Sequence, residues 1–372
     1  MKIPSNLILS KFNPVILEFC KEHKIQLDSD YDCLLSFLLY QQSIKETSTN
    51  EFSLTIPKEY LESLPVDFST FPLNYNEYEL ELLRETFLYK RIHQQKEEFE
   101  KLYKNICDHF SENIILSKYK IDKEKFRNFY LVLSSRSFGL DTEDGTFNAL
   151  VPYGDMFNTS INPNERSCFW YFDEDKNFQV EAARDIPIKD EIFIRYGDGY
   201  NSEFLLYYGF TVEKNYHGKI ENFEIKDDSG NKICEFFIKT NPSIKDYNLE
   251  NIKIYLKNKF QDHDMYYDDL YVFELIKKNL NCAYKIYEKD RNYIYEKYKY
   301  KINPFNLVNI IRIYEEEKIV IEKNLDFIEK VLEVLKQNSN LNEIFLKDQE
   351  LSYFDIEYFN KKADNQKINN RL

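Results

Sequence analysis

The glycines of this chain are few and are confined to one stretch. There are 8 among 372 residues, about 2% where ~7% is usual, and all of them lie between Gly139 and Gly230. Glycine supplies positive φ angles and close backbone approach, so tight turns and ligand-cradling loops are expected in this stretch. The flanking segments are expected to be mostly helical. A glycine-rich phosphate loop or a dinucleotide fingerprint near the N-terminus is excluded.

The composition is that of a globular protein with an acidic surface. Hydrophobic residues make up 43% of the chain and aromatic residues 16%, and the length suggests two or three domains. A net charge of -14 disfavours binding to a nucleic-acid backbone and favours basic protein partners. The tyrosine- and lysine-rich segment at 284–301 could form a nucleic-acid surface, but the exposed face of a long helix is the favoured interpretation. We therefore expect no nucleic-acid partner.

The cysteines, histidines and acidic residues show no metal-binding pattern. The six cysteines are scattered without a CxxC pair, and the five histidines have no ligand spacing. The acidic segment at 260–271 lacks the glycine and glutamate of an EF-hand. We expect no metal, and reduced thiols in a cytoplasmic or nuclear protein. The start, MKIPSNLILSKF, is too short and polar for a signal peptide, and no apolar run approaches the ~18 residues that span a bilayer.

The hydrophobic period changes twice along the chain, which predicts an α+β protein. Helical spacing of three to four residues covers 31–116, interrupted by a proline-rich segment at 56–75 that is expected to be an extended loop. An amphipathic helix is predicted over 126–138, and helical spacing returns from Asn248 onward. Short strands, separated by turn signals at 143–145 and 173–176, are predicted at 147–157, 167–172 and 178–186.

The glycine-containing stretch carries several short polar and aromatic motifs in a fixed order. Their order resembles that of the SET-domain methyltransferases, especially the group similar to Rubisco large-subunit methyltransferase. Single motifs of this kind are weak, whereas five in order are specific. The matching positions are Arg136 and Phe138; Asp155, Met156 and Asn158; Ala183, Arg184, Asp185, Glu191 and Ile192; Tyr196 and Gly197; and Asn201 to Leu206 followed by Tyr208, Gly209 and Phe210.

The resemblance implies a fold and a division of the chain. It implies a small β-rich SET core with an inserted helical region, followed by a mostly α-helical C-terminal domain that binds the protein substrate. The implied segments are an N-terminal remnant of the SET core at 1–30, the insertion at 31–125, the C-terminal half of the core at 126–216, and the helical domain at 217–372.

The resemblance also implies an activity, transfer of a methyl group from S-adenosyl-L-methionine to a protein side chain. By resemblance, Tyr196 is the catalytic phenol, and Tyr208 places a second hydroxyl beside the acceptor amine in the substrate channel. Arg136 binds the carboxylate of the cofactor, and Asn158 holds the cofactor together with Thr159, which replaces the histidine of the family. Phe210 forms a wall against the cofactor, and Phe138 lines the substrate channel.

A lysine is the expected acceptor. Its ammonium group, with a pKa near ~10.4, must lose a proton before it can attack, and a narrow aromatic channel favours the neutral form. The histidine-methylating branch of the family has, by resemblance, a polar amide where this chain has Phe138, and a phenylalanine suits a lysine chain better. We expect a protein substrate, no metal and a monomer.

One alternative stays open at this stage. Family members carry a G-x-G motif about ten residues before the segment that starts here at Ile3, where it would let the backbone approach the cofactor. Without that motif, the chain could be a SET-like protein-binding module that has no catalytic activity. The retained residues Tyr196, Asn158 and Arg136 favour the enzyme.

Overall fold

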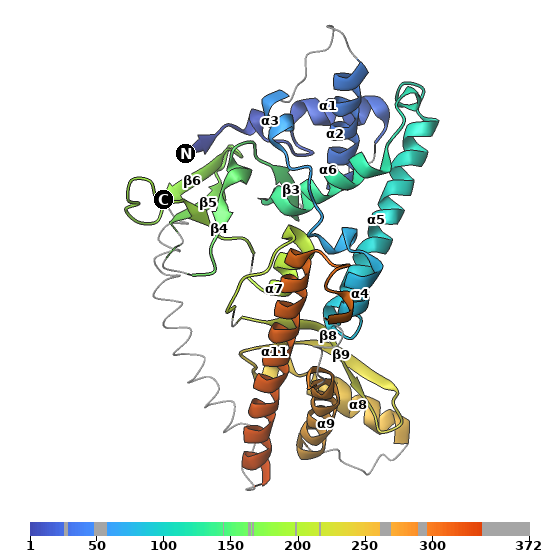
Figure 1. Cartoon of the computed structure of the whole chain (residues 1–372), viewed down its shortest axis with the longest axis vertical. Coiled ribbons are helices and arrows are strands. Elements are labelled where there is room, and N and C mark those ends of the chain that lie inside the picture. The colour runs from blue at the N-terminus through green and yellow to red at the C-terminus, as the bar shows by residue number, and fades with distance from the viewer. Residues whose placement is uncertain are drawn as a thin grey trace. The chain divides into compact units, whose positions relative to one another are not determined.

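The computed structural model describes residues 1–25, 29–47, 58–143, 145–162, 165, 167–197, 199–215, 217–260, 269–288 and 296–336. The chain forms two compact units (Figure 1). The first consists of Met1–Glu81, Tyr89–Glu213 and Ile302–Asn309, and the second of Leu82–Leu88, Lys214–Lys301 and the chain from Ile310 on.

The helices of the first unit precede most of its strands in the sequence. In the core of this unit, α2 packs against α1 and α6, and the side chains of Leu34, Leu35 and Leu38 are fully buried. Asn13 caps the start of α1 by accepting a hydrogen bond from the Val15 amide, with a proline at the first helical position. The helices are α1 (Pro14–His23), α2 (Asp30–Thr47), α3 (Lys58–Ser63), α4 (Glu77–Leu83), α5 (Phe87–Glu112) and α6 (Lys123–Arg136).

Seven short strands of the first unit form three small sheets, ordered β1-β6-β5, β2-β3 and β4-β7. Among the strands of the described residues, β4 and β7 pair in parallel and the others pair in antiparallel orientation. Leu9 exchanges backbone hydrogen bonds with Leu150, which ties the N-terminal segment to the end of β3. The strands are β1 (Lys2–Ile3), β2 (Ser137–Thr142), β3 (Gly145–Leu150), β4 (Asn158–Thr159), β5 (Cys168–Phe172), β6 (Phe178–Ala182) and β7 (Phe193–Ile194).

The sheets lead into a short helix that one glycine ends. Helix α7 (Asn201–Glu203) continues as a π-helical turn, η5 (Phe204–Tyr208), and Gly209 then takes a φ of 76°. A Cβ atom at Gly209 would lie 2.5 Å from the ring of Phe71, so both the backbone conformation and the close approach require glycine here.

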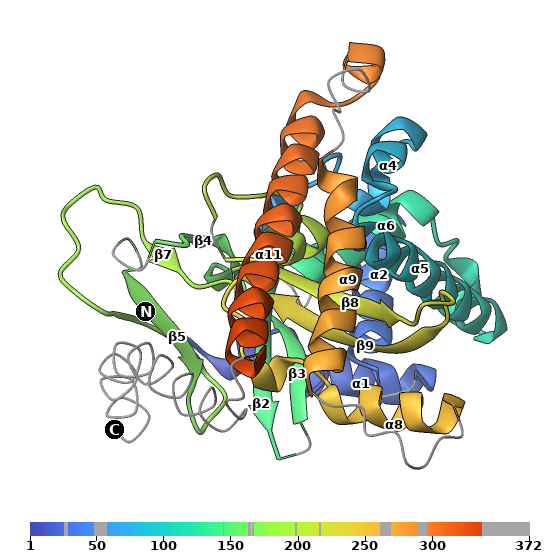
Figure 2. The same ribbon diagram turned by 90° about the horizontal axis from the view of Figure 1, so that it is seen from below.

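The second unit is a β-hairpin with long helices. β8 (Lys219–Lys226) pairs with β9 (Lys232–Lys239) in antiparallel orientation, followed by α8 (Leu249–Phe260), α9 (Asp269–Tyr287) and α11 (Pro304–Lys336), whose first residues belong to the first unit. In Figure 2, α9 and α11 run side by side, consistent with a hydrogen bond from the Tyr284 hydroxyl to Glu322.

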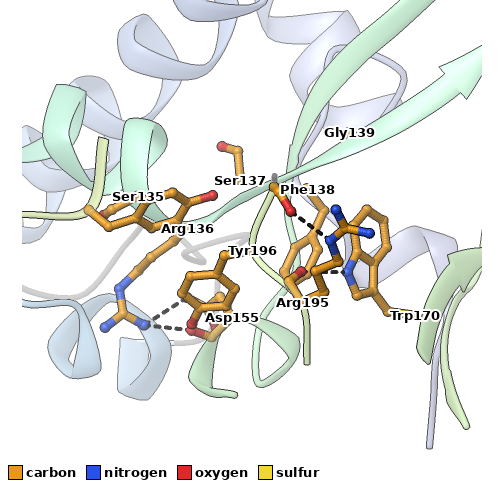
Figure 3. Close-up of a pocket in the computed structure, with 11 residues that line it drawn as sticks. Ser135, Arg136, Ser137, Phe138, Gly139, Asp155, Trp170, Arg195 and Tyr196 are labelled. Atoms are coloured by element: carbon orange, nitrogen blue, oxygen red, sulfur yellow. Dashed lines mark hydrogen bonds and ion pairs between the residues drawn. The ribbon is translucent and has the colours of Figure 1, made fainter. Parts of the chain in front are cut away.

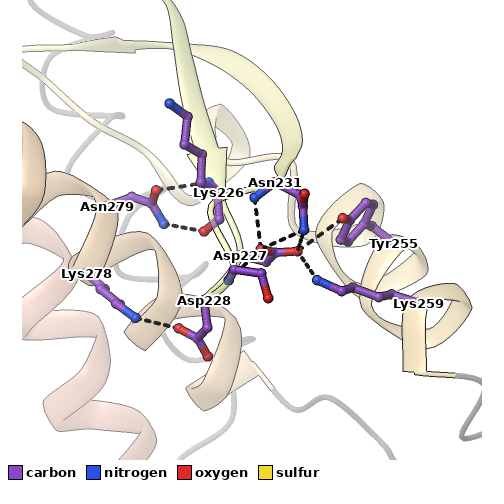
Figure 4. A network of polar contacts seen from close by, with 9 residues as sticks. Lys226, Asp227, Asp228, Asn231, Tyr255, Lys259, Lys278 and Asn279 are labelled. Atoms are coloured by element: carbon purple, nitrogen blue, oxygen red, sulfur yellow. Dashed lines mark hydrogen bonds and ion pairs between the residues drawn. The ribbon is translucent and has the colours of Figure 1, made fainter.

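A buried carboxylate and a hydrogen-bonded turn stabilise the second unit. Glu317, 2% exposed, accepts hydrogen bonds from the amides of Phe87 and Leu88 at the start of α5 and from the Tyr287 hydroxyl. At the turn between β8 and β9, Asp227 accepts hydrogen bonds from the Ser229 and Asn231 amides and from the side chains of Tyr255 and Lys259 on α8 (Figure 4). These contacts fix the hairpin turn on α8.

The α+β class expected from the sequence is confirmed, and several local expectations are wrong. The proline-rich segment is not extended throughout, because Lys58–Ser63 form α3, which buries Tyr60 and Leu61. The helix predicted over 126–138 ends at Arg136, and Phe138 lies on β2, where burial alternates with the strand period. The strand predicted over 147–157 ends at Leu150 and is followed by a 3-10 turn at Gly154–Met156. Helix α1 and the β8–β9 hairpin were not anticipated.

Two of the segments singled out in the sequence extend beyond the part of the chain that the structure describes. Residues 261–268 of the acidic segment and 289–295 of the tyrosine- and lysine-rich segment lie outside the described residues. Within the described chain, no three metal-ligating side chains gather into a site. No helix of the described residues is long and apolar enough to cross a membrane.

Candidate active site

A pocket of about 180 Å³ lies within the first unit, where segments distant in sequence meet (Figure 3). The last turn of α6 and the start of β2 form one side. Trp170 on β5, residues that follow β3 and β7, and the last residue of η5 complete it. The lining residues are Ser135, Arg136, Ser137, Phe138, Gly139, Asp155, Trp170, Arg195, Tyr196, Gly197 and Tyr208.

One wall of the pocket holds an ion pair. Arg136, in the last turn of α6, donates from Nη1 to the backbone oxygen of Asp155 at 2.9 Å and to its Oδ2 at 3.3 Å. The Asp155 side chain is only 1% exposed, and the Tyr60 hydroxyl donates to the same Oδ2 at 3.0 Å. Burial raises the pKa of Asp155, while the Arg136 charge and the Tyr60 hydrogen bond oppose that rise.

Two buried polar atoms of the lining have no hydrogen-bond partner among the described residues. They are the Ser137 hydroxyl oxygen and Asp155 Oδ1. A buried polar atom without a partner costs about 1–3 kcal/mol, so such atoms in a pocket indicate where a ligand could bind. A carboxylate paired with an arginine suits a ligand that carries both positive and negative groups.

Two tyrosines stack in the pocket. The rings of Tyr196 and Tyr208 lie 4.9 Å apart at 21°. The Tyr196 hydroxyl donates to the Phe157 carbonyl, and the Tyr196 amide donates to the hydroxyl of Thr159 at 3.1 Å. Burial, with a contribution from Tyr208, raises the pKa of Tyr196 to about 12, and burial also raises the pKa of Tyr208. Both side chains are therefore neutral phenols at physiological pH.

The opposite wall is aromatic. Phe138, 8% exposed, contacts Trp170 edge-on at 5.0 Å between ring centroids and Phe178 at 4.6 Å. The indole nitrogen of Trp170 donates to the backbone oxygen of Arg195 at 3.4 Å, just before Tyr196. An apolar wall next to two neutral phenols disfavours a charged ligand group at this point.

The structure brings four of the seven sequence-predicted site residues into one pocket: Arg136, Phe138, Tyr196 and Tyr208. The other three do not line it. Thr159 contacts Tyr196 as described above, and Asn158 donates to Glu191 at 2.5 Å. Phe210 stacks on Phe204 at 5.0 Å and meets Tyr208 edge-on at 6.3 Å.

Sequence reasoning missed several residues of the site. Asp155 belongs to a motif that was recognised, but it was given no role. Trp170 and Arg195 lie in strand-like segments with no distinguishing signal. Tyr60 was placed in a loop, and its contact with Asp155 joins positions 95 residues apart, which a single sequence does not reveal.

Comparisons with known proteins identify the class. Residues 13–197 match the family model of the SET domain, and this chain is a SET-domain protein. Its fold is similar to the SET domain of Rubisco LSMT bound to lysine and AdoHcy, with a TM-score of 0.64 and 18% identity over 90% of this chain and 82% of that one. Rubisco LSMT bound to sinefungin and monomethyllysine gives a TM-score of 0.62 with 20% identity over 94% and 86%.

Curated relatives match a smaller part of the chain. The actin-histidine N-methyltransferase of Xenopus tropicalis is 28% identical over 168 residues, which is 44% of this chain and 28% of that protein. The mouse protein (Mus musculus) of the same name is 29% identical over the same shares. The match thus spans little more than a quarter of the length of these relatives.

Proposed function

We propose that this protein is an S-adenosyl-L-methionine-dependent protein methyltransferase whose acceptor is a lysine side chain. The observation that carries the proposal is the meeting of Tyr196, Tyr208, Phe138 and Arg136 in one pocket. The similar Rubisco LSMT structures hold AdoMet or AdoHcy and lysine compounds, in agreement with such a site.

The residues of the pocket fit the methionine end of the cofactor. That end carries a carboxylate and an ammonium group, which match the Arg136 guanidinium and the unpartnered Asp155 Oδ1 and Ser137 hydroxyl. Thr159 and Phe210 contact the lining residues Tyr196 and Tyr208, and Asn158 precedes Thr159 on β4. We assign all three to the remainder of the cofactor. When bound, S-adenosyl-L-methionine supplies an electrophilic methyl group on a sulfonium.

The protein's own contribution is alignment, desolvation and a neutral phenol. Phe138 and Trp170 exclude water and disfavour an ammonium, so a lysine enters the reaction as the free amine. The hydroxyls of Tyr196 and Tyr208 remain protonated and present fixed dipoles to the amine and the transferred methyl group. The ring stack and the Thr159 contact keep Tyr196 in place. An in-line displacement requires such a fixed orientation of the groups around the reacting atoms.

The apolar pocket wall favours lysine over histidine as the acceptor. Phe138 presents no hydrogen-bonding group, whereas an imidazole ring has one nitrogen that must be paired when buried. The actin-histidine methyltransferase relatives match less than half of this chain, so their substrate does not carry over.

Isothermal titration calorimetry with S-adenosyl-L-methionine, followed by mass spectrometry of lysine- and histidine-containing peptides, tests the proposal. Saturable heat and a gain of about 14 daltons on lysine for each methyl group transferred support it. A folded protein that gives no heat at high micromolar cofactor would overturn it and favour a SET-like binding module.

A further inference from the structure

We propose that Tyr60 is a positioning residue of the cofactor site, acting through Asp155 on Arg136. Tyr60 fixes the carboxylate of Asp155, and that carboxylate fixes the guanidinium so that its other nitrogens remain available to the pocket. The inference rests on the proposed function, because the group to be bound is the carboxylate of S-adenosyl-L-methionine.

Tyr60 is held firmly. It belongs to α3, which packs Tyr60, 2% exposed, and Leu61, 9% exposed, into the main core of the first unit. Its hydroxyl lies 3.0 Å from Asp155 Oδ2 in a fully buried contact. A side chain fixed by its ring at one end and by a hydrogen bond at the other limits the rotation of the carboxylate it contacts.

Asp155 passes this constraint to Arg136. The Tyr60 hydroxyl and Arg136 Nη1 both donate to Oδ2, and Nη1 also reaches the backbone oxygen of Asp155. Both Arg136 contacts use one nitrogen, and Nη2 and Nε make no hydrogen bond to the described residues. Guanidinium is planar and rigid, so pinning Nη1 sets the direction of the Nη2–Nε edge, which can bind a carboxylate in bidentate fashion.

The arrangement also predicts a pH dependence. The groups that face Asp155 are Arg136 from α6, Tyr60 from α3 and the Tyr196 phenol that follows β7. Burial raises the pKa of Asp155, and the Tyr60 hydroxyl and the Arg136 charge lower it. Removing the hydroxyl lets the pKa of Asp155 rise further, so the ion pair with Arg136 is lost at a higher pH as the solution is acidified.

The test is calorimetric titration with S-adenosylhomocysteine from pH 8 to pH 5.5, on wild type, Tyr60→Phe and a matched control. The control, Tyr247→Phe, also removes a buried tyrosine hydroxyl, one that donates to Asn324 in the second unit. Tyr60→Phe is expected to weaken binding about tenfold at pH 7 and more at pH 6. At saturating cofactor its kcat should stay within about twofold of wild type, and Tyr247→Phe should bind as wild type does.

The outcomes separate the two proposals. A Tyr60→Phe protein with the wild-type Kd at every pH would overturn this inference and leave the proposed function intact. A folded wild type that binds no S-adenosylhomocysteine would overturn both. If Tyr60→Phe does not fold, Asp155→Asn, which keeps the size of the side chain and an oxygen for Tyr60, provides the test. It should bind more weakly and lose the pH dependence, and wild-type affinity in that variant would refute the inference.

Discussion

The rings of Tyr196 and Tyr208 stack at 4.9 Å between centroids, and the Tyr196 hydroxyl is bonded to the Phe157 carbonyl. The two stacked rings therefore form one wall of the pocket. Tyr196 belongs to the segment after β7, and Tyr208 is the last residue of η5. Tyr208 precedes Gly209, and Tyr196 precedes Gly197, so each ring is placed by a turn in the glycine-containing stretch.

Replacing Tyr196 with phenylalanine should abolish methyl transfer without weakening cofactor binding. The ring and its stack remain, whereas the hydroxyl dipole and its hydrogen bond to the Phe157 carbonyl are lost. The kcat should therefore fall by about 100-fold or more while the Kd changes less than about threefold. Single-turnover transfer and calorimetry measure the two quantities. Tyr171→Phe is the control, since its exposed hydroxyl donates to Glu181 and Tyr171 does not line the pocket. Unchanged activity in the Tyr196 variant would remove this residue from the catalytic role.

Replacing Phe138 with asparagine should shift the acceptor preference toward histidine. The new amide offers an imidazole the hydrogen bond that phenylalanine lacks, and it makes the channel less suitable for an aliphatic lysine chain. The ratio of lysine to histidine methylation in mixed peptides, measured by mass spectrometry, should fall by at least about tenfold.

The matched control for this change is Phe172→Asn. Phe172 packs on Phe178 in the same aromatic cluster but does not line the pocket. Phe138→Asn should lose about 3 kcal/mol of stability because it removes a buried core ring, and Phe172→Asn should lose less because that ring is partly buried. An unchanged acceptor ratio in a folded Phe138→Asn protein would contradict the assignment of Phe138 to the substrate channel.

Gly209→Ala should destabilise the protein more than a glycine change with the same backbone angle elsewhere. The added Cβ would lie 2.5 Å from Phe71, on top of the cost of a φ of 76°, so a loss of about 3–5 kcal/mol is expected. Gly230→Ala, with a φ of 83° and open space around the Cβ, should cost only about 1 kcal/mol. Urea unfolding of both variants measures the difference, and equal losses would mean that Phe71 moves aside freely.

Glu317→Gln should weaken the second unit. The carboxylate accepts hydrogen bonds from two amides at the start of α5 and from the Tyr287 hydroxyl, and its negative charge interacts favourably with the dipole of α5. The amide should therefore cost about 1–3 kcal/mol. The control is Glu329→Gln, on α11 like Glu317. The Glu329 side chain is 56% exposed and forms an ion pair with Lys277, so its replacement should change stability by less than about 0.5 kcal/mol. Thermal unfolding of the two proteins distinguishes them. A Glu317 variant as stable as the Glu329 variant would contradict the capping role.

The sequence predicted the class of fold and much of the pocket, because those features leave local signals. Helical spacing located α5, α6 and α9, and the ordered motifs contained Arg136 and Tyr196. What it missed depends on distant contacts. Phe138 was placed at the end of the helix predicted over 126–138, yet pairing with Ala149 on β3 makes it part of a strand. The role of Tyr60 depends on its hydrogen bond to Asp155, which joins positions that are distant in the sequence.

The second unit shows the same limit. The hairpin turn carries the signal Asp-Asp-Ser-Gly-Asn at 227–231, and the flanking strands alternate in burial. Neither was predicted, because the helical pattern that follows is stronger. The contact of Asp227 with Lys259 on α8 explains why that turn is ordered, and no spacing rule connects these two residues.

Trp170 gives the pocket an optical property of its own. It is the one tryptophan in a chain with 30 tyrosines, and it stands in the pocket wall against Phe138. Light absorbed by indole and not by phenol therefore excites a single side chain at the site of interest. Emission from the unmodified protein would report the local polarity there, and follow the arrival and departure of small molecules in real time without any attached dye.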